Sequence, residues 1–170
     1  QHYNLFSTIG HEIFHSVIFK EWATKSDAYK NGMECLNDHF NRTCDLFGEG
    51  SCNSGAQTFT EDGPDIEGLR IDYEFLFQNY NEHELKDVVF KSDSLSVNRE
   101  QAFFYLHGIT FCQTITKINN HTDVHSPSQV RVNGVVTQMP EFSRAFACTP
   151  DQLMYAHKNK VCHLFGPESK

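Results

Sequence analysis

Two histidines and one glutamate near the start of the chain have the residue types and the spacing of a zinc site. Residues 10–15 read Gly-His-Glu-Ile-Phe-His, the pattern H-E-x-x-H, inside an apolar stretch. Residues i and i+4 of a helix share one face, so the imidazoles of His11 and His15 can reach one ion. Glu12 projects from the neighbouring surface, where its carboxylate can take a proton from a zinc-bound water. The pattern predicts a hydrolytic zinc centre. The alternative is two hydrogen-bonded histidines on a buried helix.

An acidic stretch further along the chain can complete such a centre, which needs a third protein ligand and keeps its fourth position for water. The candidate ligands are Glu61, Asp62, Asp65 and Glu67. Glu61 and Asp65 are four residues apart and would share one helical face. One of them can bind the metal while the other accepts the N–H of a metal-binding histidine. The alternative is that acidic side chains favour the N-terminus of a helix.

Helices are needed to position these residues. A first helix is predicted over residues 2–24, where apolar residues recur every four positions at Leu5, Ile9, Ile13 and Val17. A second helix is predicted over residues 60–80, and Pro64 fits it only in the first turn, where a missing N–H has no partner to lose. A third is predicted from Ser96–Asn98, with Asn98 or Ser96 as its cap, to Cys112.

The remaining segments are predicted to be mostly irregular. Asn, Asp and Gly are frequent in them, and Asn31-Gly32 is expected to end the first helical region. The predicted loops are residues 31–57, 81–97 and 113–139, the last with one strand over 130–137. Pro140 and Pro150 predict short helices over residues 140–147 and 150–157. The fold class is therefore mainly α, in a single domain over residues 1–170.

Charge and hydropathy exclude two classes of partner. The net charge is −8, so no basic stripe is available to meet the phosphates of a nucleic acid. No apolar run reaches the roughly 20 residues that span a bilayer, and no membrane contact is expected from this segment. The chain starts with Gln1 inside a predicted helix and without a signal peptide, which we expect of a piece of a longer protein.

Cysteines and glycosylation sequons indicate an extracellular setting. The chain has 6 Cys, which is many for a cytosolic protein of 170 residues, and none of them forms a C-x-x-C motif. Sequons occur at Asn41-Arg42-Thr43 and Asn120-His121-Thr122. The prediction is a secreted protein or the ectodomain of a single-pass membrane protein.

A series of motifs runs in order along nearly the whole chain. These are the stretches at residues 10–15 and 61–65, Phe103-Phe104 leading to Phe111-Cys112, Asp-Val-His-Ser-Pro at 123–127, Arg-Val-Asn-Gly at 131–134, Phe-Ser-Arg-Ala-Phe-Ala-Cys at 142–148, and Cys162. The series resembles the C-terminal catalytic part of the neprilysin and endothelin-converting-enzyme family of zinc metallopeptidases. The resemblance implies a zincin-like catalytic half, with an H-E-x-x-H helix, a third-ligand helix and an irregular to helical C-terminal segment. It also implies that the chain is truncated at its N-terminus relative to the family.

The resemblance assigns roles on the metal side of the site. It implies that His11, His15 and Glu61 are ligands of Zn²⁺ and that Glu12 is the general base. Asp65 resembles the carboxylate that orients a metal-binding histidine. These roles agree with the chemistry that the residue types allow.

The resemblance also assigns roles on the substrate side. His125 resembles the residue that donates to the oxyanion of the transition state, with Asp123 behind it, and Arg131 resembles the cation that holds a substrate carbonyl. One departure lies beside the metal motif, where residues 16–18 are Ser-Val-Ile and the family has Gly-Phe-Asp. The family's upstream substrate-binding strand has no counterpart in this sequence.

The family pattern also implies disulfides. It pairs Cys44 with Cys162 and connects Cys112 and Cys148 to cysteines upstream of this sequence. Cys35 and Cys52 are then left to pair with each other, although six cysteines allow 15 arrangements.

Three functions remain open. The first is a zinc endopeptidase that cuts peptide substrates on the amino side of large apolar residues, as the resemblance implies. The second is a non-catalytic, zinc-binding extracellular relative or fragment that acts as a binding module. The third is a structural domain without a metal. The 170 residues alone are expected to cleave peptides poorly, because a substrate has no edge strand with which to pair.

Overall fold

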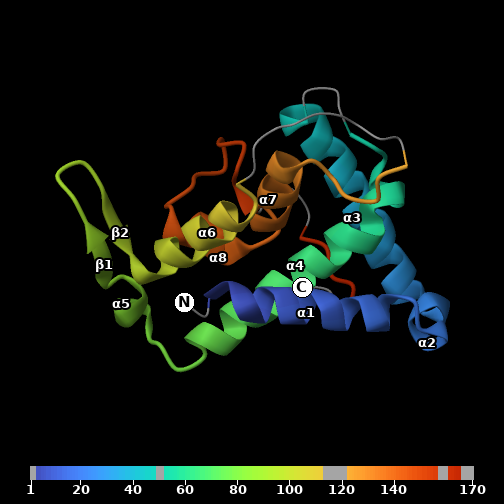
Figure 1. The fold of residues 1–170 in the computed structure, drawn as a ribbon, viewed down its shortest axis with the longest axis horizontal. Coiled ribbons are helices and arrows are strands. Elements are labelled where there is room, and N and C mark those ends of the chain that lie inside the picture. Colours follow the sequence, from blue (N-terminus) through green and yellow to red (C-terminus); the bar gives the residue numbers. More distant parts are fainter. Residues whose placement is uncertain (1–2, 49–51, 113–121, 157–160, 166–170) are drawn as a thin grey trace.

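The computed structural model describes residues 3–48, 52–112, 122–156 and 161–165, and this part of the chain is mainly α-helical, as predicted (Figure 1). A two-stranded antiparallel hairpin, at the left of Figure 1, projects from the helical body. The elements are α1 Tyr3–Ile18, α2 Glu21–Lys25, α3 Asp27–Phe47, α4 Gly55–Phe77, α5 Glu82–Leu85, β1 Val88–Lys91, β2 Ser96–Asn98, α6 Arg99–Thr110, α7 Ser128–Val136 and α8 Pro140–Ala145.

Two glycines allow helices α1 and α4 to cross in close contact. A Cβ atom on Gly10 would lie 3.0 Å from the Cα atom of Gly68. A Cβ atom on Gly68 would lie 2.8 Å from the backbone nitrogen of His11. No larger residue fits at this crossing without a backbone shift. The glycine that precedes the H-E-x-x-H motif therefore brings the first histidine against α4.

Helix α4 starts earlier than predicted and includes its proline. It begins at Gly55, and the side chain of the N-cap residue Ser54 accepts a 3.3 Å hydrogen bond from the backbone N–H of Gln57. Pro64 therefore lies inside the helix and not in its first turn. It removes one helical hydrogen bond, a cost that is offset because its neighbours, including Asp65 and Ile66, are buried in the protein.

The predicted loop over residues 31–57 is wrong for most of its length, because residues 27–47 form helix α3. Tyr29, Leu36 and Phe40 are buried on one side of this helix at helical spacing. Gly32 does not end a helix but lies where a side chain would clash with the carbonyl oxygen of His163. The Asn-Gly pair was interpreted as a turn, although this glycine serves a close backbone contact.

Four smaller predictions also need correction. The first predicted helix is interrupted at residues 19–20 and continues as α2. The predicted loop 81–97 contains α5 and the hairpin strands, and the predicted strand 130–137 is helix α7, which buries Val130, Val135 and Val136. Residues 150–155 form turns and not a helix, and residue 157 lies outside the described residues. Much of the predicted irregular segment, residues 113–121, also lies outside them.

Helix α6 agrees with its prediction. The side chain of Asn98 caps it by accepting a 2.8 Å hydrogen bond from the backbone N–H of Gln101. In return, the Gln101 side chain accepts a 3.1 Å bond from the backbone N–H of Asn98. Phe103 and Phe104 are buried within the aromatic core. The short helix that begins at Pro140 is also confirmed as α8.

The two disulfides differ from the predicted pairing. Cys35 pairs with Cys162 and Cys44 pairs with Cys52. Cys44 lies in the last turn of α3, so the chain that leaves this helix can return with Cys52 only eight residues later. Cys35 lies in the middle of the helix, where the segment 161–165 passes, so it meets Cys162. Cys112 and Cys148 are not disulfide-bonded.

Candidate metal centre

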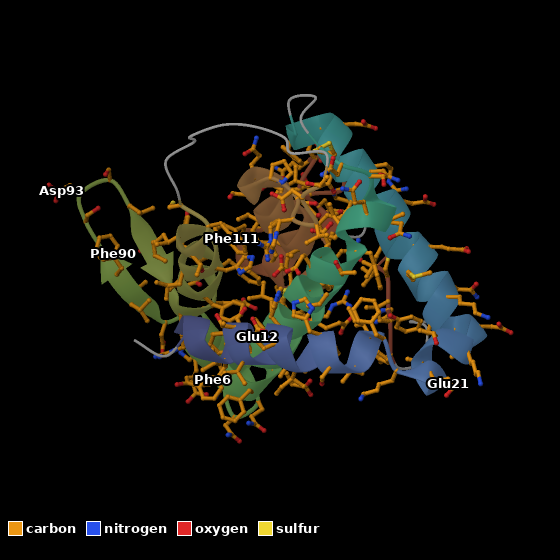
Figure 2. All side chains as sticks on the ribbon, turned by 45° about the vertical axis from the view of Figure 1, so that its right-hand side comes forward. Phe6, Glu12, Glu21, Phe90, Asp93 and Phe111 are labelled. Carbon is orange, nitrogen blue, oxygen red and sulfur yellow. A yellow bond between two sulfur atoms is a disulfide. The ribbon has the colours of Figure 1, made fainter. Side chains whose placement is uncertain are left out.

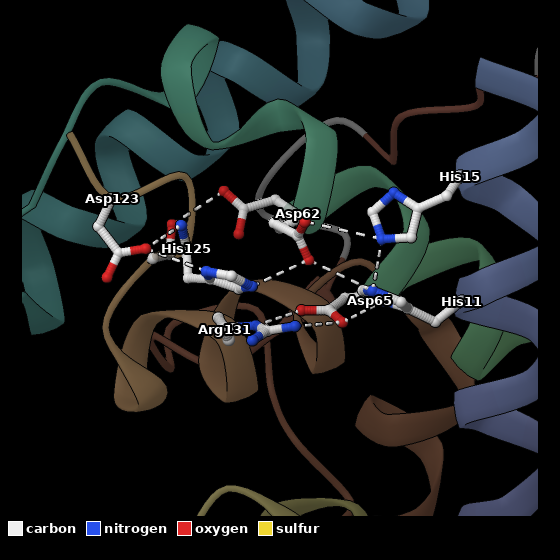
Figure 3. A network of polar contacts seen from close by, with 9 residues as sticks. His11, His15, Asp62, Asp65, Asp123, His125 and Arg131 are labelled. Carbon is white, nitrogen blue, oxygen red and sulfur yellow. Dashed lines mark hydrogen bonds and ion pairs between the residues drawn. The ribbon is translucent and has the colours of Figure 1, made fainter. Parts of the chain in front are cut away.

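Side chains from α1 and α4 converge on one point (Figure 3). The Nε2 atoms of His11 and His15 lie 2.9 Å apart. The carboxylate of Glu61 faces both of them, with Oε2 3.3 Å from Nε2 of His11 and Oε1 3.6 Å from Nε2 of His15. One donor atom from each of the three residues lies within 4.8 Å of the other two.

This donor set fits a zinc ion. Zinc binds imidazole nitrogen and carboxylate oxygen at about 2.0–2.2 Å, so two donors in a tetrahedral site lie about 3.4 Å apart. The observed separations of 2.9, 3.3 and 3.6 Å lie around that value. The three side chains are only 13–29% exposed. Three protein donors would leave one coordination position open, as hydrolytic zinc sites require.

Asp65 supports the first histidine from behind. Its Oδ1 atom lies 2.8 Å from Nδ1 of His11. With the proton on Nδ1, the Nε2 lone pair of His11 points toward the convergence point. Asp65 is in turn held by Arg131, which donates from Nε to Oδ2 at 2.6 Å and from Nη2 to Oδ1 at 2.8 Å. The contacts from Arg131 through Asp65 therefore hold His11 in position and favour the tautomer with its proton on Nδ1.

The pKa values in this group reflect mutual stabilisation of charge. Burial lowers the pKa of His11, but the hydrogen bond and the charge of Asp65 outweigh it, and the pKa is raised. Burial raises the pKa of Asp65, but its hydrogen bonds with His11 and Arg131 outweigh burial, and the pKa is lowered. Burial also lowers the pKa of Arg131, and Asp65 reverses this effect, so the pKa is raised. Asp65 is therefore a buried carboxylate that stays ionised.

A second Asp–His pair meets the centre from the loop that precedes α7. The Nε2 atom of His125 lies 3.2 Å from Oε2 of Glu61. Its Nδ1 atom lies 3.0 Å from Oδ1 of Asp123, which also accepts a 2.9 Å bond from the backbone N–H of His125. Both side chains are about half exposed. A protonated or correctly oriented imidazole here can donate to a group that enters beside the convergence point.

The other two acidic candidates point elsewhere. Oδ2 of Asp62 accepts a 2.9 Å hydrogen bond from the hydroxyl of Ser126, and burial raises the pKa of Asp62 to about 7. Glu67 pairs with Arg70 at 2.8 Å. Among the four acidic candidates, Glu61 is thus the one whose carboxylate faces both histidines.

Glu12 lies outside this polar network but close to it. Its exposed side chain lines a cavity of about 190 Å³ together with His11, Asp65 and Arg131. His107 and Phe111 line the same cavity and were not predicted as site residues. A signal was available, because Phe103, His107 and Phe111 follow one another at intervals of four, which puts a polar residue on a buried helical stripe.

Comparison with known sequences identifies the class of protein. Residues 5–162 match the sequence pattern of peptidase family M13. Because this match covers most of the 170 residues, the chain belongs to peptidase family M13.

Individual relatives agree with this assignment at modest identity. Neprilysin-3 of Drosophila melanogaster is 26% identical over an alignment of 163 positions that covers 86% of this chain and 20% of that protein. Neprilysin of Homo sapiens is 29% identical over an alignment of 175 positions, gaps included, that covers 92% of this chain and 22% of that protein. Endothelin-converting enzyme 1 of Homo sapiens is 29% identical over an alignment of 150 positions that covers 82% of this chain and 18% of that protein. The chain thus spans about a fifth of the length of these relatives.

Proposed function

We propose that this chain is the catalytic part of a zinc-dependent endopeptidase that hydrolyses peptide bonds. The observation that carries the proposal is the convergence of His11, His15 and Glu61, with distances of 2.9–3.6 Å between facing donor atoms. Asp65 behind His11 adds support, because a metal-binding histidine usually donates the N–H of its other ring nitrogen, here Nδ1, to a carboxylate. Membership of a peptidase family makes a peptide the expected substrate.

The residues around the centre have the chemistry that peptide hydrolysis needs. Zinc with an open coordination position polarises a carbonyl group and makes a coordinated water more acidic. We propose that Glu12 accepts the proton of the attacking water and passes it to the leaving amine. His125, oriented by Asp123, donates to the oxyanion that forms on the substrate carbonyl. Two N–H groups of Arg131 donate to Asp65, and the remaining ones are proposed to hold a substrate carbonyl.

An extracellular setting is part of the proposal. The Cys35–Cys162 and Cys44–Cys52 disulfides support it, because such bonds persist in oxidising compartments. Asn41 belongs to one sequon and is exposed on α3, although its Oδ1 accepts a 2.7 Å bond from the backbone N–H of Gly55. The other sequon lies mostly outside the described residues. Within the described part of the chain, no helix combines the length and apolar character needed to cross a bilayer.

The test is a Glu12→Gln substitution, which keeps the shape of the side chain and removes the base. Cleavage of a fluorogenic peptide should fall by about 10²–10⁴, with zinc content unchanged. Glu21→Gln is the matched control, since the Glu21 side chain is 81% exposed on α2 and should leave the rate unchanged. Cleavage by the Glu12 variant within a few-fold of the wild-type rate would show that another group activates the water. Because the 170 residues alone are expected to cleave poorly, the assay uses a longer protein that adds the family's upstream strand, and stoichiometric zinc with no cleavage by that protein would favour the binding-module alternative.

A further inference from the structure

Helix α4 supports the oxyanion side of the site as well as its metal side. It packs against α1 and against α7, and the side chains of the three helices fill the space between them (Figure 2). Gln57, Glu61 and Asp65 follow one another on α4 at intervals of four, so they share one face. Glu61 and Asp65 face the histidines of α1, whereas Gln57 donates from Nε2 to the backbone carbonyl oxygen of Asp123 at 3.1 Å. One face of α4 therefore meets both halves of the proposed reaction centre.

The loop that carries His125 has little burial around the histidine itself. The side chains of Asp123 and His125 are about half exposed, and Val124 between them is exposed as well. A segment with few buried contacts opens locally at a low free-energy cost. The position of the His125 ring therefore depends on contacts that its neighbours in the loop make with the rest of the protein.

Ser126 is the buried anchor of this loop. It directly follows His125 in the chain and is 6% exposed. Its hydroxyl donates a 2.9 Å hydrogen bond to Oδ2 of Asp62, which is 1% exposed on α4. Figure 3 shows Asp62 and His125 on these two neighbouring segments. A buried carboxylate that loses such a donor is left with its full desolvation penalty, so the bond resists opening.

The contacts on the other side of His125 are weaker restraints. The backbone carbonyl oxygen of Asp123 accepts a 2.8 Å bond from Nδ2 of Asn53 in addition to the bond from Gln57. Both of these bonds lie at exposed positions, where water competes for the same groups. Among these contacts of the loop, the bond between Ser126 and Asp62 is the one that water does not replace.

We propose that Asp62 and Ser126 are positioning residues, which hold His125 at the reaction centre of the endopeptidase. Through this bond, α4 sets where the imidazole lies relative to Glu61, whose Oε2 is 3.2 Å from Nε2 of His125. A catalytic group that is misplaced by about 1 Å lowers the rate by up to about 10²-fold. This inference rests on the proposed function. The alternative is a buried polar pair that only stabilises the fold.

Ser126→Ala tests the proposal, because it removes the hydroxyl and leaves the loop sequence otherwise intact. In the longer protein that adds the upstream strand, kcat for a fluorogenic peptide should fall about tenfold. The KM and the zinc content should stay within about twofold, because His125 meets an oxyanion that forms only after attack. An effect on kcat of less than about twofold, or a loss that appears only in KM, would overturn the proposal.

Ser143→Ala is the matched control for the loss of a buried hydroxyl. Ser143 is also buried, and its Oγ accepts a 2.8 Å bond from the backbone N–H of Ala156, away from the metal centre. This change should lower stability and leave kcat unchanged. A loss of kcat equal to that of Ser126→Ala would show that reduced stability, and not the position of His125, explains the rate.

A double-mutant cycle with His125→Ala separates positioning from stability. If Ser126 acts through His125, Ser126→Ala should lower kcat by less than about twofold in the His125→Ala background. Asp62→Asn keeps an oxygen that accepts from Ser126 and should retain kcat within about threefold, whereas Asp62→Leu should match Ser126→Ala. Equal effects of Ser126→Ala in both backgrounds would contradict the assignment. If Asp62→Leu does not fold, Ser126→Ala and the cycle still decide the question.

Hydrogen exchange gives a readout that does not need catalysis. The backbone amide of His125 donates to Oδ1 of Asp123 at 2.9 Å, so its exchange rate reports the order of the loop. In the zinc-loaded 170-residue chain, Ser126→Ala should speed this exchange about tenfold and leave the amides of α8 unchanged. An unchanged rate at His125 would mean that Ser126 does not hold the loop.

The failure of this inference differs from the failure of the proposed function. If the wild-type longer protein holds one zinc and does not cleave, the proposed function falls, and this inference falls with it. If that protein cleaves and Ser126→Ala leaves both kcat and the exchange at His125 unchanged, the proposed function stands and the positioning role is wrong.

Discussion

Two Asp–His pairs of the same chemistry lie on opposite sides of Glu61, one buried and one exposed. Asp65 faces Nδ1 of His11 at 2.8 Å, and the Asp65 side chain is 7% exposed. Asp123 faces Nδ1 of His125 at 3.0 Å, and its side chain is 50% exposed. The buried carboxylate is also held by Arg131, whereas among the described residues Asp123 accepts its second bond from the backbone N–H of His125.

The difference shows what burial does to one hydrogen-bonding pattern. In the interior, a charge that loses its partner cannot be rescued by water, so the Asp65 pair is tied to the stability of the fold. At the surface, water screens the charge and replaces the lost bond, so the Asp123 pair affects little beyond the orientation of His125. The proposed metal-binding half of the site is therefore tied to the fold, whereas the half proposed to bind the oxyanion is a local arrangement on a loop.

The largest effect is expected from Asp65→Asn. This change leaves the mostly buried guanidinium of Arg131 without its counter-charge, so the free energy of unfolding should fall by about 3–5 kcal/mol. Zinc affinity should also fall, by about 10–100-fold, because His11 loses its orienting partner. Urea unfolding and zinc titration measure the two quantities. A loss below 1 kcal/mol would mean that the buried and exposed pairs are equivalent.

Asp72 sharpens the comparison, because it is buried like Asp65 but no cation and no side-chain donor among the described residues pairs with it, and a backbone contact with Ser7 only partly offsets the effect of burial. Burial raises its pKa to about 7 from 3.8. The folded state then keeps a proton that the unfolded state has released, so stability should fall as the pH rises from about 4 to about 7 and then level off. The loss should be about 2–3 kcal/mol, because we expect a smaller effect than the roughly 1.4 kcal/mol per pKa unit that full desolvation would give.

Urea unfolding between pH 4 and pH 8, with a chelator present, measures this dependence. Asp72→Asn should remove the part of the pH dependence that arises from Asp72. The free energy of unfolding of the variant should equal that of the wild type near pH 4 and exceed it above pH 7. Parallel curves for the two proteins would show that Asp72 is ionised throughout and has a partner.

A smaller effect is expected at the crossing of α1 and α4. A methyl group at Gly68 would meet backbone atoms of Ser7 and His11 at 2.9 and 2.8 Å. Gly68→Ala should lower the free energy of unfolding by about 1–2 kcal/mol, net of the gain in helix propensity. It should also weaken zinc binding, because it moves α4 away from the histidines. Gly108→Ala is the matched control, since the new methyl group would lie 3.9 Å from its nearest neighbour, a side-chain carbon of Val132. Equal effects of Gly68→Ala and Gly108→Ala on stability and zinc affinity would show that the crossing of α1 and α4 does not position the site.

The smallest effect is expected from Asp123→Asn. An exposed pair contributes less than about 1 kcal/mol, so urea unfolding should barely change. Zinc affinity should stay within a few-fold of the wild type, because Asp123 does not contact His11, His15 or Glu61. A stability loss as large as that of Asp65→Asn would contradict the distinction between the two pairs.

The sequence predicted the convergence of the proposed metal ligands better than it predicted the surrounding structure. His11 and His15 are one helical turn apart, so their convergence needs only local geometry. Glu61 and Asp65 repeat the same spacing on α4, and the family resemblance selected Glu61. The structure brings all of these residues together in the predicted arrangement, while their roles as ligands remain a proposal.

The wrong predictions share one physical cause, which is that contacts distant in sequence override local signals. Gly32 was predicted to end a helical region and Pro64 to lie in the first turn of a helix. Instead, Gly32 accommodates the backbone of His163, and Pro64 lies inside a helix that its neighbours bury. The disulfides follow the course of α3, a helix that lies where a loop was predicted. The spacing of Phe103, His107 and Phe111 puts His107 on a buried helical stripe, but the sequence does not show that this stripe borders a cavity.

The most direct test of the account is the zinc content of the chain. Purified wild-type protein should hold one zinc per chain by elemental analysis, and a chelator should lower its Tm. The His11→Ala, His15→Ala double variant should hold none, whereas His83→Ala, at an exposed histidine of α5, should keep the full amount. One zinc per chain in the double variant would contradict the assignment of His11, His15 and Glu61 as the metal centre.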